Sequence, residues 1–165
     1  LPAAITRGTC PGAATMLLVT CLIGLTACSP GGGPSYADVR AQAEDAVAEI
    51  VAALPDGAEF VPDGGASAQT CDSEVSPRGR AAGDFATVHG AVSLPEGTDA
   101  AAIVTELPVA LGDGWALEPT GVELDIATVR LSRAETNVSV DVTESTVDGR
   151  PGLDLLAVSE CGREG

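Results

Sequence analysis

A short apolar run that ends near a cysteine divides this chain into a leader and a part that can fold as a domain. Arg7 is the only charged residue among the first 27, and residues 13–25 are almost entirely apolar. A helix needs about 20 apolar residues to cross a bilayer, whereas this run has about a dozen and lies between Pro11 and Pro30. We therefore expect residues 1–27 to be a signal peptide and the fold to lie beyond them.

The residues Leu25-Thr26-Ala27-Cys28 resemble the lipobox of bacterial lipoproteins, in which Leu and two small residues precede a cysteine. The resemblance implies cleavage before Cys28 and attachment of diacylglycerol to its sulfur, often with an acyl chain such as palmitate on the new amine. Two acyl chains hold a protein stably on a membrane. This predicts a protein anchored on the outer face of the bacterial cell membrane, with no cofactor besides the lipid. The alternative is an ordinary secretory signal with an incidental cysteine.

The mature chain, residues 28–165, is strongly acidic. Its 138 residues are enough for one domain, and seven Arg stand against 24 acidic residues, a formal charge of −17. Such a charge repels nucleic acid and an anionic bilayer surface, so we expect no nucleic-acid partner. Solubility is the simplest role of the charge, and a cationic partner or Ca²⁺ is the alternative. The absence of Lys and the abundance of Ala, Gly, Asp and Val are typical of actinobacterial proteins.

The cysteines predict one disulfide. If Cys10 and Cys21 leave with the signal and Cys28 carries the lipid, Cys71 and Cys161 remain. An even pair in an exported, oxidising location is expected to form a bond. We expect no metal site, because two Cys and one distant His make no ligand cluster.

Apolar periodicity predicts two helices and several strands. In residues 35–54 apolar side chains recur every three or four positions, after a capping pair of Ser35 and Asp38. A second helix follows Thr98, and Pro108 is expected to kink or end it. The segments expected to form strands are 84–94, 115–118, 126–133, 137–144 and 153–161, with a shorter one at 58–62 and a loop at 63–77.

This order of elements predicts an α+β domain at residues 35–165, joined to the signal by a Gly/Pro tether at 28–34. We expect a two-layer sandwich, with both helices on one face of a mainly antiparallel sheet of about five strands. The mature chain resembles a group of small actinobacterial lipoproteins that includes the LppA-like ones. The shared features are the lipobox, a helix after the tether, Gly114-Trp115, a valine-rich hairpin and the closing Ser159 and Cys161. This resemblance implies a cell-envelope lipoprotein with no known reaction.

The sequence contains no recognisable catalytic motif. His89 is the only histidine, and the chain has neither a Gly-x-Ser-x-Gly elbow nor a Gly-rich phosphate loop. We therefore expect no catalytic residues and a binding or structural domain, whose partner is an envelope protein or a cell-wall component. The alternative is a hydrolase-like enzyme with dispersed active-site residues, which a pocket holding His89 beside a carboxylate would favour.

Strand alternation predicts a mainly polar sheet face on the side away from the helices. Apart from Phe85, the side chains expected there are Thr87, His89, Ser93, Thr128, Arg130, Ser132, Ser139, Asp141 and Thr143. Polar residues on one face of several strands indicate that this face meets water. We expect His89, Arg130 and Asp141 to share this face and to contact an anionic or neutral envelope partner. The alternative is a sheet face that is merely solvated.

Overall fold

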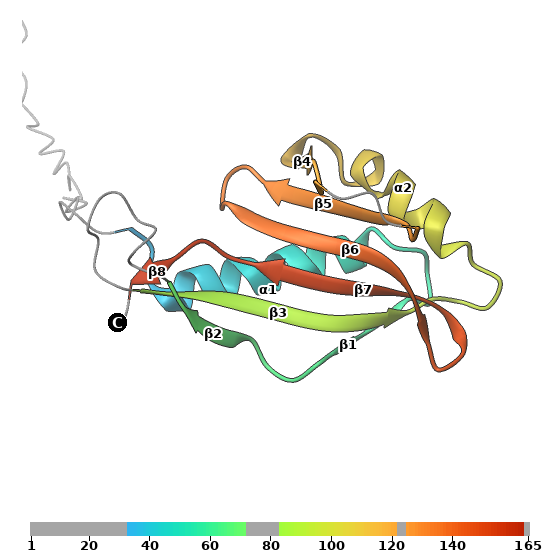
Figure 1. Cartoon of the computed structure of the whole chain (residues 1–165), viewed down its shortest axis with the longest axis horizontal. Helices are drawn as coiled ribbons and strands as arrows, with labels where there is room; N and C mark the ends of the chain where they lie inside the picture. The colour runs from blue at the N-terminus through green and yellow to red at the C-terminus, as the bar shows by residue number, and fades with distance from the viewer. Residues whose placement is uncertain (1–32, 72–82, 122–124, 164–165) are drawn as a thin grey trace, which may run out of the picture. The chain divides into compact units, whose positions relative to one another are not determined.

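A computed structural model describes residues 33–71, 83–121 and 125–163, and over these ranges the fold is α+β (Figure 1). The predicted signal peptide and the lipidation residue Cys28 lie outside the described residues. The elements are α1 (Tyr36–Ala52), β1 (Glu59–Pro62), β2 (Ser67–Thr70), β3 (Gly83–Ser93), α2 (Ala100–Leu111), η1 (Gly112–Gly114), β4 (Trp115–Glu118), β5 (Thr128–Arg133), β6 (Val138–Val147), β7 (Arg150–Val158) and β8 (Gly162–Arg163). None of the helices in these ranges combines the length and the apolar character that a membrane span requires.

Within the described residues the strands form one sheet in the order β1-β3-β7-β6-β5-β4, with β2 and β8 also paired to β3. All of these pairings are antiparallel. The sheet has eight strands, so the expected number of about five was too low. Strand β2 lies inside the segment predicted as a loop, and its four residues are all exposed. Such a strand buries no face, so it leaves no apolar alternation in the sequence.

Helix α1 begins and packs as its sequence predicts. The Ser35 amide donates to Asp38 Oδ2 (2.9 Å), and the Asp38 amide donates to Ser35 Oγ (3.2 Å), which completes a capping box. The residues that it buries recur at the predicted helical spacing: Val39, Ala43, Ala46, Val47 and Ile50. This apolar stripe fixes the side of the helix that faces the sheet.

Helix α2 begins one residue later than predicted and continues through its proline. Asp99 is the N-cap, and its side chain accepts a hydrogen bond from the Ala102 amide (3.0 Å). The helix runs past Pro108 to Leu111, so of the two expected effects of Pro108, a kink or an end of the helix, the second does not occur. A proline removes one main-chain hydrogen bond from a helix, and here only the final turn follows it.

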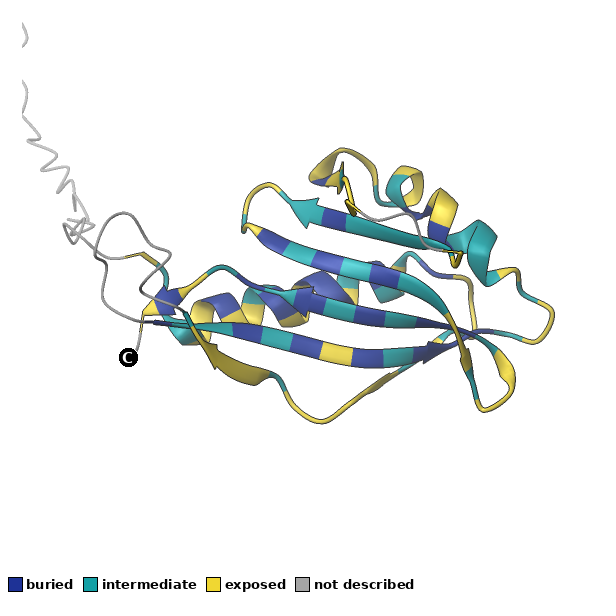
Figure 2. Cartoon of the chain, viewed as in Figure 1, coloured by how far each residue is buried: buried dark blue, intermediate teal, exposed yellow. Residues whose placement is uncertain are grey.

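The hydrophobic core contains buried residues of both helices and of one face of the strands. Val88 pairs with Ala157, Ala157 with Val140, and Val140 with Leu131, which places these side chains on the same face. Residues of α1 and α2, among them Ile50 and Leu107, belong to the same cluster. Buried positions alternate with partly or fully exposed ones along β3, β6 and β7 (Figure 2). The exposed alternates belong to the opposite face of the sheet.

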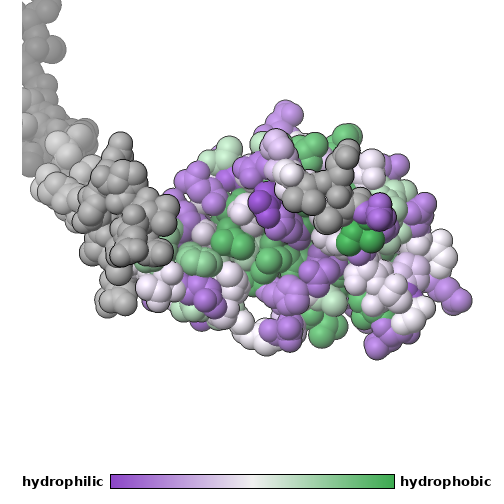
Figure 3. Space-filling view, in the orientation of Figure 1, coloured by the Kyte–Doolittle hydropathy of each residue, from purple (hydrophilic) through white to green (hydrophobic). Residues whose placement is uncertain are grey.

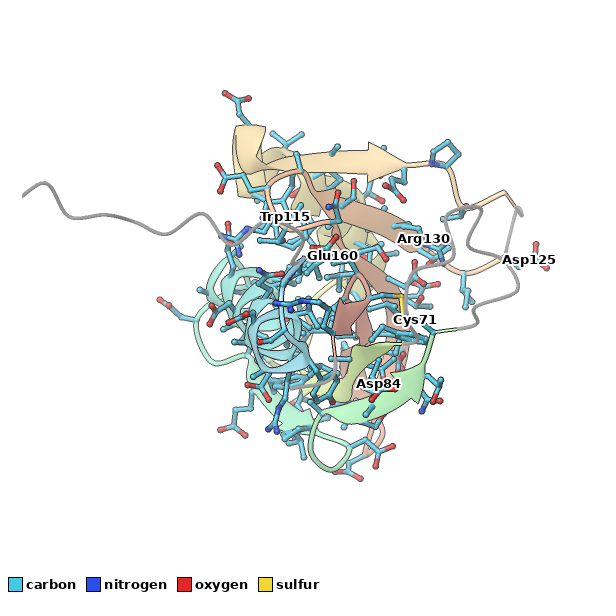
Figure 4. The ribbon with its side chains drawn as sticks, turned by 90° about the vertical axis from the view of Figure 1, so that its left-hand side faces the viewer. Cys71, Asp84, Trp115, Asp125, Arg130 and Glu160 are labelled. Carbon is cyan, nitrogen blue, oxygen red and sulfur yellow. A yellow bond between two sulfur atoms is a disulfide. The ribbon has the colours of Figure 1, made fainter. Side chains whose placement is uncertain are left out.

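One carboxylate joins helix α1 to strands β4 and β5. Glu49 accepts a hydrogen bond from Trp115 Nε1 (3.0 Å), and its other oxygen lies 3.0 Å from Arg133 Nη2. Trp115 therefore lies on the helix side of the sheet (Figure 4). This contact fixes α1 against the far edge of the sheet as well as against its centre.

The final strand closes over the start of α1. The Arg163 amide donates to the Pro34 carbonyl (2.9 Å), and the Arg163 side chain donates to the Gly33 carbonyl (2.8 Å). Ser35 also forms an isolated parallel bridge with Arg163. A Cβ on Gly162 would lie 2.7 Å from main-chain atoms of Ser35, so this close approach requires glycine.

Candidate functional site

The structure brings His89, Arg130 and Asp141 into one row across the sheet. His89 on β3 pairs with Leu156 on β7, Leu156 with Asp141 on β6, and Asp141 with Arg130 on β5. Directly opposed residues point to the same side of a sheet. Arg130 projects away from helix α1 (Figure 4), and all four positions alternate with core positions.

We call the surface formed by this row and the two rows beside it the outer face. Its residues are Thr87, His89 and Ala91 of β3; Val158, Leu156 and Asp154 of β7; Ser139, Asp141 and Thr143 of β6; and Ser132, Arg130 and Thr128 of β5. These side chains are partly exposed, and His89 is exposed to 44%. The three predicted contact residues are therefore accessible from the same side.

The outer face is less polar than the sequence predicted. Leu156 and Val158 lie on it because β7 runs through the middle of the sheet. Val61 pairs with Ala91, so it extends the face onto β1, where its side chain is 61% exposed. In the same orientation as Figure 1, hydrophobic and hydrophilic residues are mixed over the visible surface (Figure 3). The expectation of a mainly polar face came from β3, β5 and β6 and did not include the side chains of β7.

Arg130 on β5 and Asp141 on β6 form a bidentate salt bridge. Arg130 Nε and Nη2 each lie 2.7 Å from a different oxygen of Asp141. The hydrogen bond with Asp141 and the charge of this carboxylate raise the pKa of the Arg130 guanidinium. Beside the pair, the hydroxyls of Thr128 and Thr143 lie 2.9 Å apart. The charges of Arg130 and Asp141 are thus paired with each other within the outer face.

His89 lies between two carboxylates. Its Nε2 is 3.0 Å from Asp154 Oδ2, and its Nδ1 is 3.4 Å from Asp63 Oδ2. Partial burial lowers the pKa of His89, but the charge and hydrogen bond of Asp154, followed by those of Asp63, outweigh this effect. The net result is a raised pKa. His89 therefore keeps its proton to a higher pH than an isolated histidine does.

Sequence reasoning missed both of these carboxylates. Asp63 lies in a segment predicted as a loop, 26 residues from His89, and Asp154 lies 65 residues away on β7. The alternation of Leu153 and Leu155 could have placed Asp154 on the outer face. Its contact with His89, however, depends on β7 pairing with β3, which local patterns do not reveal.

A disulfide between Cys71 and Cys161 joins two segments that flank β3. Cys71 follows β2, and Cys161 precedes β8, and their Cα atoms are 6.3 Å apart. The Cys71 amide also donates to the Gly83 carbonyl at the start of β3 (2.8 Å). The bond lies at the end of β3 that pairs with β8 (Figure 4).

The geometry around His89 resembles a charge-paired contact more than a proton-transfer site. In a catalytic triad one ring nitrogen faces a carboxylate, and the other faces a nucleophile. Here each of the two nitrogens faces a carboxylate. Across residues 33–71, 83–121 and 125–163, no group of three or more His, Cys, Asp or Glu side chains could hold a metal ion.

Comparison with protein-family models, with curated proteins and with solved structures finds no match to this chain.

Proposed function

We propose that this chain is a cell-envelope lipoprotein, held on the outer face of the membrane by lipid on Cys28, with a binding or structural domain that is not an enzyme. The observation that carries the proposal is the sequence Leu25 to Cys28, which follows an apolar signal and precedes a Gly/Pro tether. The bond between Cys71 and Cys161 supports export, because disulfides persist in oxidising compartments.

Replacing Cys28 with alanine is expected to abolish lipid attachment and cleavage before residue 28. The thioether needs the cysteine sulfur, so the variant should keep its signal, migrate as the larger precursor and take up no labelled palmitate in a bacterial host. Gel mobility and metabolic labelling measure both effects. Cys21→Ala is the matched control, and it should be labelled and processed like the wild type. Normal mobility and labelling of Cys28→Ala would contradict the proposal.

We also infer a two-layer sandwich, in which α1 and α2 cover the same face of the sheet. Support comes from the single hydrophobic cluster that residues of both helices share with β3, β5, β6 and β7. In this arrangement no helix or strand of the described residues lies over the outer face, which is a broad surface that a partner could reach.

We propose that the outer face is where an envelope partner binds. The charges of Arg130 and Asp141 neutralise each other in a salt bridge, and His89 lies between the carboxylates of Asp63 and Asp154. Together with the exposed parts of Leu156 and Val158, this favours a neutral protein or cell-wall surface over a strongly charged one. Paired charges at such a surface contribute more to specificity than to affinity.

A photo-reactive amino acid at Ser132, on the outer face, is expected to form a discrete adduct in intact envelopes. The same group at Asp113, in the exposed turn η1, should not form that adduct. The combined variant His89→Gln, Arg130→Gln and Asp141→Asn should weaken the Ser132 adduct, because it removes the polar pattern of the face. An equal adduct at Asp113 would contradict the proposal that the partner binds the outer face. A Ser132 adduct that the combined variant leaves unchanged would also contradict it.

An envelope hydrolase is the second candidate, and the contact between His89 and Asp154 is the observation that favours it. A hydrolase of this kind needs a nucleophile in reach of the second ring nitrogen. Because Asp63 occupies that position, the geometry supports the binding function better.

A further inference from the structure

One edge of the sheet is built from two short strands that meet at His89. Strand β1 pairs with Gly90–Ser93 of β3, and β2 pairs with Asp84–Thr87. His89 and Val88 lie between these two pairings, opposite the turn that links β1 to β2. Gly64 makes part of this turn with a φ of 83°, which glycine adopts easily. The edge is therefore discontinuous where the only histidine of the chain is located.

His89 holds this turn through both its main chain and its side chain. The Asp63 amide donates to the His89 carbonyl (2.9 Å), and the Asp63 carboxylate faces Nδ1 of the ring. On the other side the ring contacts Asp154 of β7. One imidazole thus connects the turn of the edge strands to a central strand.

The charge of the ring decides whether these contacts attract. Among the described residues, the charged groups that face the ring are Asp63 from the turn and Asp154 from β7, both acidic. The neighbouring positions on β1, β2 and β7 are uncharged, namely Val61, Ser67 and Leu156. Farther along the row, Asp141 is paired with Arg130. A cationic His89 therefore attracts both nearby carboxylates and offsets one of their two negative charges, whereas a neutral His89 leaves both charges uncompensated.

We propose that protonated His89 is a pH-sensitive clasp that keeps the β1–β2 edge closed, and that loss of this proton lets the edge open without unfolding the core. Strands β1 and β2 both pair with β3, so their release exposes the polar main chain of β3. An exposed strand edge can accept a strand from another chain.

The direction of the effect follows from proton linkage. The pKa of His89 is raised in the folded protein, so protonation stabilises the closed edge. This stabilisation is complete below the pKa of histidine in the unfolded chain, which is about 6.5. It declines as the pH rises through the higher pKa of the folded state. The edge should therefore be best protected in mild acid and least protected above neutrality.

Hydrogen exchange of the full chain in detergent micelles tests the clasp. Protection factors of the Asp63 amide and of the β1 and β2 amides should be higher at about pH 5.5 than at about pH 8.5, since histidine titrates between these values. The expected loss is about tenfold for each full unit by which the folded pKa exceeds the unfolded one. Amides of β6 should change less, because the core stays closed.

Two further measurements decide between the clasp and a merely structural contact. The NMR signals of His89 should titrate at higher pH in the native chain than in urea, and Asp154→Asn should lower the native value more than Asp113→Asn does. In His89→Gln the pH dependence of edge protection should disappear, whereas Asp113→Asn should keep it. Equal titration in native and unfolded chains, or edge protection that is independent of pH in the wild type, would overturn the proposal.

Discussion

Replacing Cys71 and Cys161 together with serine is expected to lower the free energy of unfolding by up to about 4–5 kcal/mol. The two residues are 90 positions apart in the sequence, so the bond closes a long loop. Closing such a loop restricts the unfolded chain and so favours the folded state. Because domains of this size are stable by about 5–15 kcal/mol in total, the variant should lose a large share of its stability.

Urea denaturation followed by tryptophan fluorescence measures this loss, since the chain has a single tryptophan, Trp115. Wild-type protein treated with a reducing agent is the matched control and should unfold at the same urea concentration as the double variant. The core is formed without these residues, so the variant should keep its helices and strands at low temperature. Equal stability of the oxidised wild type and the double variant would show that the bond does not constrain the unfolded chain.

Replacing Leu155 with alanine is expected to lower the free energy of unfolding by about 2–5 kcal/mol. Leu155 is fully buried on β7, within the cluster that includes residues of both helices. Removing its side-chain carbons loses apolar burial and leaves a cavity in a close-packed interior. Strand β7 lies between β3 and β6, so the surroundings have little freedom to collapse into that space.

The adjacent residue provides the matched control. Leu156 has the same side chain on the same strand, but it points to the outer face and is only partly buried. Leu156→Ala should therefore lower the free energy of unfolding by less than about 1.5 kcal/mol, the lower limit for burying such a side chain completely. If both variants lost the same stability in urea denaturation, the outer face would be covered by another layer, and the two-layer arrangement would be wrong.

Much of the fold follows from local patterns in the sequence. Ser35 and Asp38 cap α1 as predicted, and the apolar stripe that follows them is buried. Alternation in β3 and β6 predicted which side of each strand faces the core, so His89 and Asp141 share a face. These features depend on residues a few positions apart, and local sequence carries that information.

The remainder depends on contacts between distant segments. Strand β2 is exposed along its whole length and β8 has only two residues, so neither shows a period, yet both pair with β3. The pair of consecutive residues Leu155 and Leu156 fits either face, and only the pairing of β7 with β3 and β6 places Asp154 beside His89. The charged surroundings of His89 therefore could not be predicted without the strand order.

The contacts of Arg163 with Gly33 and Pro34 determine how mechanical force would enter this domain. A pull on the chain at Gly33 acts first on strand β8, through hydrogen bonds to the main chain and side chain of Arg163. From β8 the load passes to β3 by strand pairing and to Cys71 through the covalent bond at Cys161. Helix α1 and the hydrophobic core are not part of this route. Tension on the amino-terminal segment would therefore load the cross-linked strand β8 before the tension could unwind the helix.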